Sequence, residues 1–382
     1  MLKINHKLKL SKFAIITHVA HIHQNSEYLG YAPYIGEMNI WLKYTNEVVI
    51  VAPLKKGNPT AIDAAYDHKK IQFRKVPDFN FTNFSNLIKS IFKLPKIVFQ
   101  IFSAMREADH IHLRCPGNMG LIGCLLQILF PCKIKTAKYA GNWDPKSKQP
   151  LTYRFQKYIL ANTFLTRNMK VLVYGEWPDQ SKNIKSFFTA SYSDLEKQQV
   201  LKINLSEAIS FVFAGTLTKG KNPLYAVEVI KELAKKGYNV TLNIFGEGLE
   251  GNNIEKFILT NHLESIVFLH GNQSREILKG AYKKCHFVIL PSQSEGWPKA
   301  IAEGMFWGCV PVATRISCVP FMLDFGKRGI LLDMDIQSDI NQLINILDNE
   351  NSFLAKSKLA SEWSQIYTTD LFDKEIKMLL QQ

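Results

Sequence analysis

Short apolar runs alternate with longer amphipathic stretches along the whole chain, and this alternation constrains the fold more than any other feature. In the first half, the apolar runs fall at residues 13–17, 47–52, 110–113, 134–137 and 170–174. In the second half they fall at 210–214, 240–245, 266–269, 286–290 and 310–313, with helical stretches such as 223–236 between them. Apolar strands separated by helices are typical of a parallel sheet flanked by helices. Because 382 residues exceed what one core usually holds, we expect an α/β protein with two doubly wound domains.

The boundary between these domains is expected near residues 188–207, where the polar segment 195–202 interrupts the alternation. We therefore predict an N-terminal domain over residues 1–190 and a C-terminal domain over 207–358. Residues 363–380 have helical spacing, so a C-terminal helix over 360–382 is expected to pack back on the first domain.

Neither export nor a membrane span is indicated by the sequence. The longest apolar stretch, residues 121–131, is interrupted by Gln127 and falls well short of the roughly 20 residues that a membrane helix needs. The basic N-terminus lacks the apolar core of a signal peptide. The six cysteines form no CxxC pair, which favours free thiols and a cytoplasmic location.

The basic charge of the chain lies entirely in its first half. Residues 1–187 contain 27 Lys and Arg against 11 Asp and Glu, whereas residues 188–382 contain 20 against 22. An anionic partner would explain this asymmetry: nucleic acid, anionic lipid or a phosphorylated substrate. The alternative is a basic surface that serves solubility. Because no nucleic-acid-binding signature is present, we expect no nucleic acid partner.

Residues 87–102 interleave lysines with large apolar side chains around Pro95. A basic amphipathic segment of this kind can lie on an anionic membrane surface, which predicts a peripheral protein on the inner face of the cell membrane. A helix that packs inside its domain is the alternative.

Several expected strands of the second half end in residues suited to bind an anion. The first is followed by Gly215-Thr216 and by Lys219 and Lys221, the next by Gly246-Glu247-Gly248, and a third by His270-Gly271. Ligands bind at the carboxyl ends of parallel strands, where glycine allows close approach to the backbone and lysine supplies a positive charge. Taken singly, each segment is equally consistent with an ordinary turn.

Two glutamates flank the start of an expected helix after the strand at 286–290. Pro298 suits the first helical position and Gly308 the position after the helix, so the amides of Lys299 and Ala300 would face outward as an anion site. On one continuous helix, Glu295 and Glu303 would lie roughly 80° apart and would not share a face. If Glu295 lies in the turn before the helix, this angle does not apply, and both side chains could reach one ligand. Carboxylates beside a phosphate site are suited to accept hydrogen bonds from hydroxyls. Hydroxyls on both sides of a diphosphate describe a nucleotide sugar.

With these motifs, residues 209–333 resemble the C-terminal half of the retaining glycosyltransferases of family 4. The resemblance is carried by Gly215…Lys221, by 245–248, by 268–271, and above all by the Glu-x7-Glu stretch from Pro291 to Ala313. It implies the GT-B fold, in which two Rossmann-like domains face each other across a cleft. It also implies a nucleotide-diphosphate-sugar as co-substrate, a glycan or a polyprenyl-diphosphate-linked acceptor, and no cofactor or metal.

The resemblance assigns roles residue by residue. Glu295 and Lys221 would be the catalytic residues, Glu295 near the hydroxyls of the donor sugar and Lys221 on the diphosphate. Glu303 would hold the ribose, and Glu247 and His270 would lie by the nucleoside. The donor site as a whole is expected to comprise Gly215, Thr216, Lys219, Glu247, Gly248, His270, Gly271, Gly296, Trp297, Lys299, Ala300 and Glu303.

Two positions depart from the family pattern. Thr216 stands where the family often has arginine, and the usual Gly-Gly-x-x-Glu is replaced by residues 317–321. An inactive GT-B subunit that binds a sugar or a partner is therefore an alternative, and a sugar-nucleotide epimerase of similar fold is another.

The resemblance is weaker in the first half. His18 follows the first strand, and Asn142 and Asp144 follow a later one, so these three residues are expected to contact the acceptor. We interpret His21 and His23 as part of a polar loop rather than a metal site, and His110 and His112 as strand residues. Asp333-Met-Asp335 matches a metal motif of a different transferase fold, and we expect no metal there.

Overall fold

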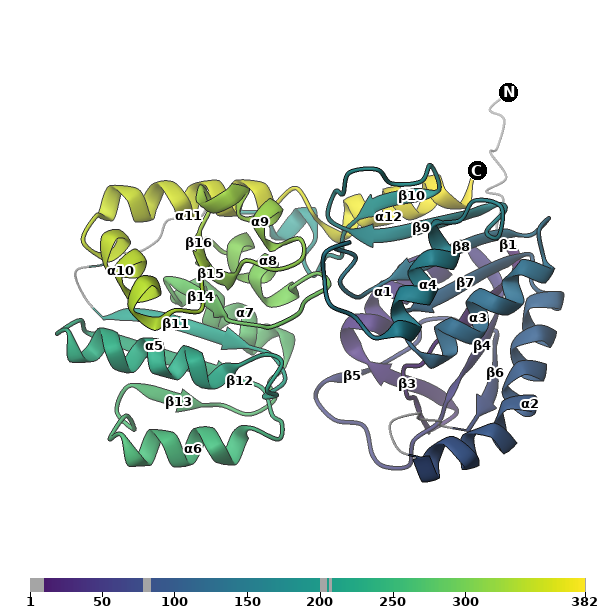
Figure 1. The fold of residues 1–382 in the computed structure, drawn as a ribbon, viewed down its shortest axis with the longest axis horizontal. Coiled ribbons are helices and arrows are strands. Elements are labelled where there is room, and N and C mark those ends of the chain that lie inside the picture. Colours follow the sequence, from purple (N-terminus) through teal and green to yellow (C-terminus); the bar gives the residue numbers. More distant parts are fainter. Residues whose placement is uncertain (1–9, 78–83, 200–204, 206–207, 382) are drawn as a thin grey trace. The chain divides into compact units, whose positions relative to one another are not determined.

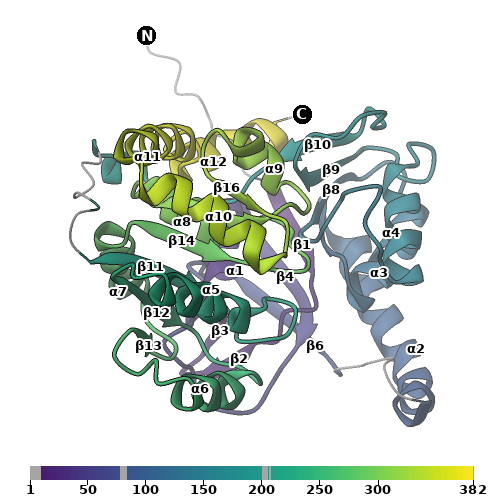
Figure 2. The ribbon, with the colours of Figure 1, turned by 60° about the vertical axis from the view of Figure 1, so that its left-hand side comes forward.

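The computed structural model describes residues 10–77, 84–199, 205 and 208–381, and the side chains of residues 10 and 84–91 lie outside this description. Figures 1 and 2 show two α/β units joined in one chain. Residues 1–188 and 372–382 form the first compact unit, and residues 189–371 form the second. Among the described residues, no helix combines the length and apolarity that crossing a membrane requires.

The first unit is built on a parallel sheet of seven strands within the described residues, in the order β10-β9-β8-β7-β1-β4-β6. These strands are β1 (Leu10–Ile16), β4 (Thr45–Pro53), β6 (Ile71–Val76), β7 (His110–Cys115), β8 (Ile134–Tyr139), β9 (Met169–Tyr174) and β10 (Ile184–Phe187). Strands β1 and β4 carry buried apolar runs, as expected where helices cover both faces of a sheet, whereas β7 and β8 also bury polar side chains such as His110, His112 and Lys138. The chain order reverses between β1 and β7, which marks a switch point where ligands bind in such sheets.

A small antiparallel sheet, which the sequence did not predict, adjoins the first strands of this unit. It pairs β2 (Ile22–Gln24) with β3 (Glu27–Tyr31), and β3 with β5 (Asp63–Ala65). Its strands are only three to five residues long, so they carry little of the hydrophobic alternation from which strands are recognised.

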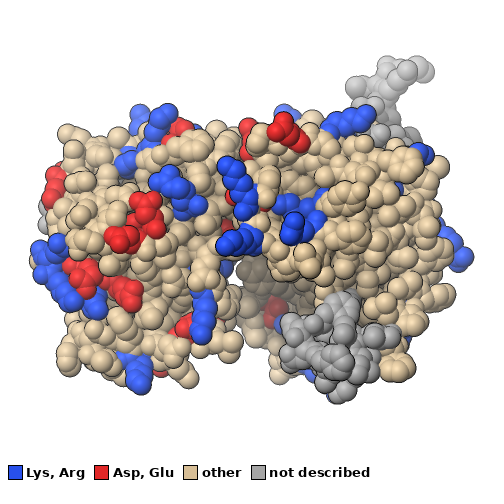
Figure 3. Space-filling model, in the orientation of Figure 1, with Lys and Arg blue, Asp and Glu red and all other residues tan. Residues whose placement is uncertain are grey.

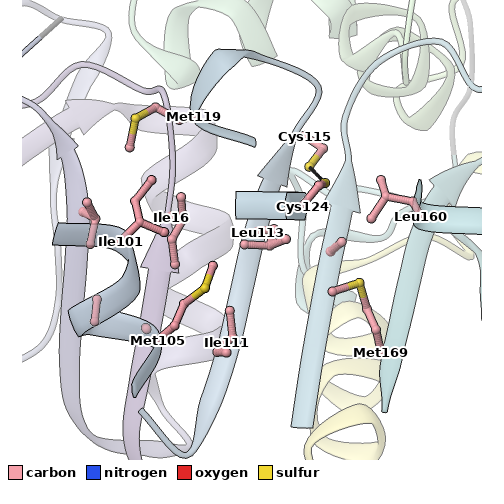
Figure 4. Packing of buried hydrophobic residues seen from close by; sticks show 14 of the residues in the cluster. Ile16, Ile101, Met105, Ile111, Leu113, Cys115, Met119, Cys124, Leu160 and Met169 are labelled. Atoms are coloured by element: carbon pink, nitrogen blue, oxygen red, sulfur yellow. Dashed lines mark hydrogen bonds between the residues drawn. The ribbon is translucent and has the colours of Figure 1, made fainter. Parts of the chain in front are cut away.

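The helices of the first unit cover both faces of its sheet. They are α1 (Ala32–Leu42), α2 (Phe84–Glu107), α3 (Asn118–Leu126) with η1 (Gln127–Leu129), α4 (Leu151–Ala161) and α12 (Thr369–Leu380). Helix α12 belongs to this unit from residue 372 onward. Helices α2, α3 and α4 lie side by side on one face (Figures 1 and 2). Met105, Met119 and Cys124 from this layer pack on Ile111, Leu113 and other strand side chains (Figure 4).

The segment 87–102 lies within α2, with Pro95 inside the helix. The side chains of residues 87–91 are outside the described part. Further on, Ile97 and Ile101 are fully buried, whereas Phe92 and Phe99 are 82% and 66% exposed. The helix therefore packs through one face and presents aromatic side chains on the other.

The second unit contains a parallel sheet in the order β13-β12-β11-β14-β15-β16 within the described residues. The strands are β11 (Ile209–Ala214), β12 (Val240–Phe245), β13 (Val267–Leu269), β14 (Phe287–Leu290), β15 (Val310–Thr314) and β16 (Ile330–Leu332). The order reverses between β11 and β14, so the loops that follow these two neighbouring strands diverge at a second switch point.

Helices cover both faces of this sheet as well. They are α5 (Pro223–Lys235), α6 (Gly251–Thr260), α7 (Arg275–Lys284), α8 (Lys299–Phe306), α9 (Val319–Met322), α10 (Ile336–Leu347) and α11 (Glu350–Ser364), with η2 (Asp194–Glu196) and η3 (Asp324–Gly326). Helix α5 packs with α6 and α10, and α8 with α7 and α11. The expected tail helix is divided into α11 and α12, because residues 365–368 form a turn between them.

The expected fold class is confirmed in each unit: both are parallel-sheet, Rossmann-like α/β domains. Acidic side chains are scattered among basic ones over the second unit, whereas few appear over the first unit on the same face (Figure 3).

Candidate functional site

The switch point of the second unit brings Lys221 and Glu295 together. Lys221 lies in the loop after β11, and Glu295 lies in the loop after β14. Their side chains form an ion pair with 2.5 Å between Nζ and Oε1. The backbone joins the same loops, since Gln293 N–H donates to the carbonyl of Gly220 at 2.8 Å. The Glu295 side chain is only 7% exposed, so Lys221 supplies the positive charge that a buried carboxylate requires.

Helix α8 begins directly after this loop, at Lys299, and Pro298 is its N-cap rather than its first residue as predicted. Lys299 and Ala300 are the first two helical residues, whose amides have no partner within the helix by geometry. Gly308 follows the C-cap with φ of 79°, a conformation that glycine adopts without strain, as predicted for the position after the helix. Glu295 lies before the helix, so the angle of roughly 80° between the two glutamates on a continuous helix does not apply.

Glu303, on α8, is held by two hydroxyls from other parts of the unit. Ser191 Oγ donates to its Oε1 at 2.5 Å, and Tyr282 OH donates to its Oε2 at 3.4 Å. Burial raises the pKa of this carboxyl, and the hydrogen bond from Ser191 opposes the rise. A small cavity beside it is lined by Ser191, Tyr192, Lys299 and Glu303 among others. Sequence reasoning missed Ser191 and Tyr282, because no local pattern marks them as partners of Glu303 and both lie far from it along the chain.

The glycines that follow β11, β12 and β13 let three loops pack backbone against backbone. Gly215 N–H donates to the carbonyl of Phe245 at 2.9 Å, and Gly246 N–H donates to that of Gly271 at 2.8 Å. A Cβ on Gly246 would lie 2.0 Å from the Gly215 oxygen, and one on Gly248 would lie 2.3 Å from the Leu217 oxygen. Close packing of the loops therefore requires glycine at these positions, in addition to the close approach of a ligand inferred from the sequence.

Glu247, His270 and Gly271 meet at the ends of β12 and β13. The Glu247 carboxylate accepts from Asn272 Nδ2 at 3.0 Å. His270 stacks on Phe245 with ring centroids 4.5 Å apart and pairs with Asn243 Oδ1 at 2.8 Å. The structure thus brings these residues to the same sheet edge as Gly215, while Thr216 and Lys219 are exposed on the neighbouring loop.

The segment that replaces the family's Gly-Gly pattern supports the Glu295 loop. Cys318 Sγ lies 3.1 Å from the carbonyl oxygen of Gly296, and Ser317 Oγ lies 3.4 Å from it. Ser317 has φ of 49°, in the left-handed region that favours glycine. Trp297 is buried against Trp363 and Tyr367, at centroid distances of 6.0 and 5.6 Å.

His18 lies at the switch point of the first unit, after β1. It faces Gly117 in the loop after β7, since a Cβ on Gly117 would lie 3.0 Å from His18 Nδ1. Burial, followed by the positive charge of Arg114, lowers the pKa of His18. His18 therefore tends to be neutral, with a ring nitrogen able to accept a proton.

Asn142 and Asp144 lie in the loop after β8, where their polar atoms organise the loop itself. Asn142 Oδ1 accepts from Asp144 N–H at 2.9 Å, and Asp144 Oδ1 accepts from Lys146 N–H at 2.8 Å. Lys157 Nζ donates to the carbonyl of Asp144 at 3.1 Å.

The interpretation of His21 as part of a polar loop is wrong. His21 is fully buried, stacks on Tyr66 and pairs with its hydroxyl at 2.9 Å, and burial lowers its pKa to about 4. His110 and His112 are buried strand residues, as predicted, and share the hydroxyl of Thr136 at 2.9 and 2.8 Å.

The Asp333-Met-Asp335 segment has structural partners. Asp335 caps α10 by accepting from Ser338 N–H at 2.8 Å, and Asp333 pairs with Arg315 at 3.6 Å. Across the described part of the chain, no three His, Cys, Asp or Glu side chains gather as metal ligands.

The chain is similar to known glycosyltransferases in sequence and in fold. The family model described as glycosyl transferases group 1 matches residues 194–365. An uncharacterised glycosyltransferase of Methanocaldococcus jannaschii is 23% identical over 188 residues, covering 49% of this chain and 51% of that protein. The putative colanic acid biosynthesis glycosyltransferase WcaL of Salmonella typhimurium is 22% identical over 182 residues, covering 45% of each. The match thus spans about half the length of these relatives.

A solved structure extends the likeness of fold to nearly the whole chain. Anabaena HepE, solved in complex with UDP and glucose, superposes with a TM-score of 0.70 at 13% identity, covering 97% of this chain and 99% of that one. The two Rossmann-like domains are therefore those of the GT-B fold, and residues 194–365 match the family of group 1 glycosyl transferases.

Proposed function

We propose that the protein is a retaining, metal-independent glycosyltransferase of cell-surface polysaccharide biosynthesis. It would move a sugar from a nucleotide-diphosphate-sugar to a glycan or to a polyprenyl-diphosphate-linked acceptor. The observation that carries the proposal is the Lys221–Glu295 ion pair at a sheet switch point, immediately before the N-terminus of α8. The names of two similar proteins support it: WcaL is named a putative colanic acid biosynthesis glycosyltransferase, and HepE was solved in complex with UDP and glucose.

The donor would be bound by residues that the second unit brings to this edge. The diphosphate would contact Lys221, with Lys219 nearby, and the first amides of α8, where the helix dipole favours an anion. Glu295 would accept hydrogen bonds from the sugar, and Glu303 would accept them from the ribose in place of Ser191. Glu247, His270 and Gly271 would flank the nucleoside.

The reaction would proceed by displacement on one face of the sugar. The bond between the anomeric carbon and the diphosphate breaks, the acceptor oxygen bonds to that carbon, and the acceptor's proton passes to a diphosphate oxygen. Lys221 and the helix amides would stabilise the leaving charge, which is the usual electrostatic source of rate. His18, Asn142 and Asp144 remain candidates for contacts with the acceptor.

The rival function is an inactive GT-B subunit that binds a sugar or a partner. It is favoured by Thr216, whose neutral, exposed side chain offers a diphosphate less charge than arginine. Slow hydrolysis of a nucleotide sugar by the purified protein would argue for the active transferase.

A thermal-shift screen across UDP-, GDP- and ADP-sugars tests the donor site, because a ligand that binds only the folded state stabilises it. We expect one nucleotide class to raise the melting temperature. If none does so at concentrations far above typical donor levels, the proposed function is wrong.

We also propose that the enzyme works in the cytoplasm at the inner face of the membrane, through the basic first unit and the exposed rings of α2. Phe92 and Phe99 supply apolar contact, and the lysines of this half supply attraction to anionic lipid. Sedimentation with vesicles that contain anionic lipid, but not with neutral vesicles, is the expected result.

A further inference from the structure

The first unit contains a cavity with a volume of about 360 Å³. Its lining includes none of the residues proposed to contact the donor or the acceptor. Its walls come from the loop after β8, from α4 and from the loop after β9. Strands β8 and β9 are neighbours (Figure 1). The loops that line the cavity follow the carboxyl ends of these two strands, so the cavity lies at that edge of the sheet. This is the edge at which parallel sheets bind ligands, and the volume lies within the range of small-molecule pockets.

Aromatic rings form the apolar part of the cavity. Trp143 is 5% exposed and fixed between Tyr139 and Lys157, and Trp177 is fixed by a hydrogen bond from its Nε1 to the carbonyl of Tyr174 at 2.8 Å. Tyr158, from α4, is 63% exposed although it lines the same cavity. Rigid rings around a polar opening offer flat surfaces to the apolar face of a ring-shaped ligand.

Three side chains of the cavity, Gln180, Arg154 and Lys157, supply hydrogen-bond donors. The Nε2 of Gln180 is buried and has no partner among the described residues. Arg154 is exposed, and in the described part of the chain no carboxylate forms an ion pair with it. Lys157 already donates to the carbonyls of Trp143 and Asp144, at 2.8 and 3.1 Å. Asp179 is the acidic residue of the lining, and it has no ion pair among the described residues.

An unpaired buried donor costs free energy that a ligand acceptor would recover. Two cations against one carboxylate favour a ligand with a negative charge. The guanidinium of Arg154 is suited to the paired oxygens of a carboxylate or a phosphate.

We propose that this cavity binds a saccharide unit that carries an anionic group. The sugar ring lies against Tyr158 and Trp177, the anionic oxygens accept from Arg154 and Gln180, and Asp179 accepts from a hydroxyl. In the proposed transferase this unit belongs to the acceptor glycan. That role rests on the proposed function, whereas binding itself does not.

The test is saturation-transfer NMR on the full chain with methyl glucuronoside, glucose 6-phosphate and neutral methyl glucoside. We expect saturable binding of at least one anionic sugar and much weaker binding of the neutral one. Preference between the carboxylate and the phosphate identifies the anionic group. Arg154→Ala should weaken binding about tenfold, the size of one charge-assisted hydrogen bond. Tyr158→Ala should weaken it severalfold.

Matched controls are available outside the cavity. Phe155→Ala removes a half-exposed ring from the same helix, and Arg167→Ala removes an exposed arginine of the same unit, and both should leave binding within about twofold. Equal binding of the neutral and anionic sugars, no saturable binding, or insensitivity to Arg154→Ala overturns the inference. Donor binding measured on the same samples separates the two proposals: if it persists while the anionic sugars fail, only this inference is lost.

Discussion

The Nζ of Lys221 lies 2.5 Å from Oε1 of Glu295, although the two residues are 74 positions apart in the chain. The pair joins the loops of β11 and β14, so the positive charge proposed for the diphosphate and the carboxylate proposed for the sugar occupy one site. Each side chain orients the other before any donor arrives.

Glu295→Gln keeps the shape of the side chain but removes its charge. We expect transfer to fall by at least about a hundredfold, as when one transition-state contact of an active site is lost. Circular dichroism should remain unchanged. Glu250→Gln, on a neighbouring loop, should retain activity. Turnover of Glu295→Gln at the wild-type rate would contradict the role of Glu295.

Lys221→Ala and Lys219→Ala compare a partly buried lysine, which is paired with Glu295, with an exposed one. Lys221 is paired and lies at the switch point, whereas Lys219 is exposed. Calorimetry with the preferred nucleoside diphosphate should show a loss of about 1.5–3 kcal/mol for Lys221→Ala, the value of a charge-assisted hydrogen bond. Lys219→Ala should cost less than about 1 kcal/mol. Equal losses in the two variants would remove the special role of Lys221.

Glu303 can be tested with the ribose rather than with the sugar. The wild type should bind the ribonucleotide more tightly than its 2′-deoxy analogue, by about 1–3 kcal/mol, because a buried carboxylate would lose a hydroxyl partner. Glu303→Ala should abolish this preference. Ser191→Ala should preserve it, since the ribose hydroxyls replace the Ser191 hydroxyl on the same carboxylate. A preference that survives in Glu303→Ala would assign the ribose to another residue.

Gly246→Ala should destabilise the second unit. The added Cβ would meet the Gly215 oxygen at 2.0 Å, and Gly246 has φ of 137°, which L-residues rarely adopt. Strain and displacement together should cost about 2–4 kcal/mol of unfolding free energy in urea titrations. Gly280→Ala, in α7 with open space around it, should instead be neutral or stabilise the unit by up to about 1 kcal/mol.

The buried histidines predict that the first unit is sensitive to acid. Burial lowers the pKa of His110 and of His112 to about 3, and that of His21 to about 4. Between those values and pH 6.5 the unfolded chain binds more protons than the folded one, so stability falls as the pH falls. Well inside this window the loss is about 1.4 kcal/mol per pH unit for each histidine.

Urea titrations between pH 7.5 and 5 measure this dependence. His110→Phe, which keeps a ring stacked on Phe13, should reduce the slope by about 1.4 kcal/mol per pH unit, the contribution of one histidine. His23→Gln, at an exposed position, should leave it unchanged. A slope that is the same in all three proteins would contradict the prediction.

The sequence by itself determined the parallel sheets and the ends of α8. Buried strands such as β14 are short apolar runs, and the limits of α8 follow from Pro298 and Gly308, so both can be recognised within a few neighbouring residues. The family pattern then indicated Glu295, Glu303 and Lys221 as site candidates.

Only the tertiary structure decided which residues surround these candidates. Ser191 and Glu303 are 112 positions apart, and the partners of His21 come from other elements of its unit. The strands β2, β3 and β5 are stabilised by pairing with one another rather than by an apolar pattern of their own. Contacts of this kind depend on how elements distant in sequence pack together. A local pattern of side chains predicts a helix or a strand, but it does not predict which residues from distant parts of the chain will contact it.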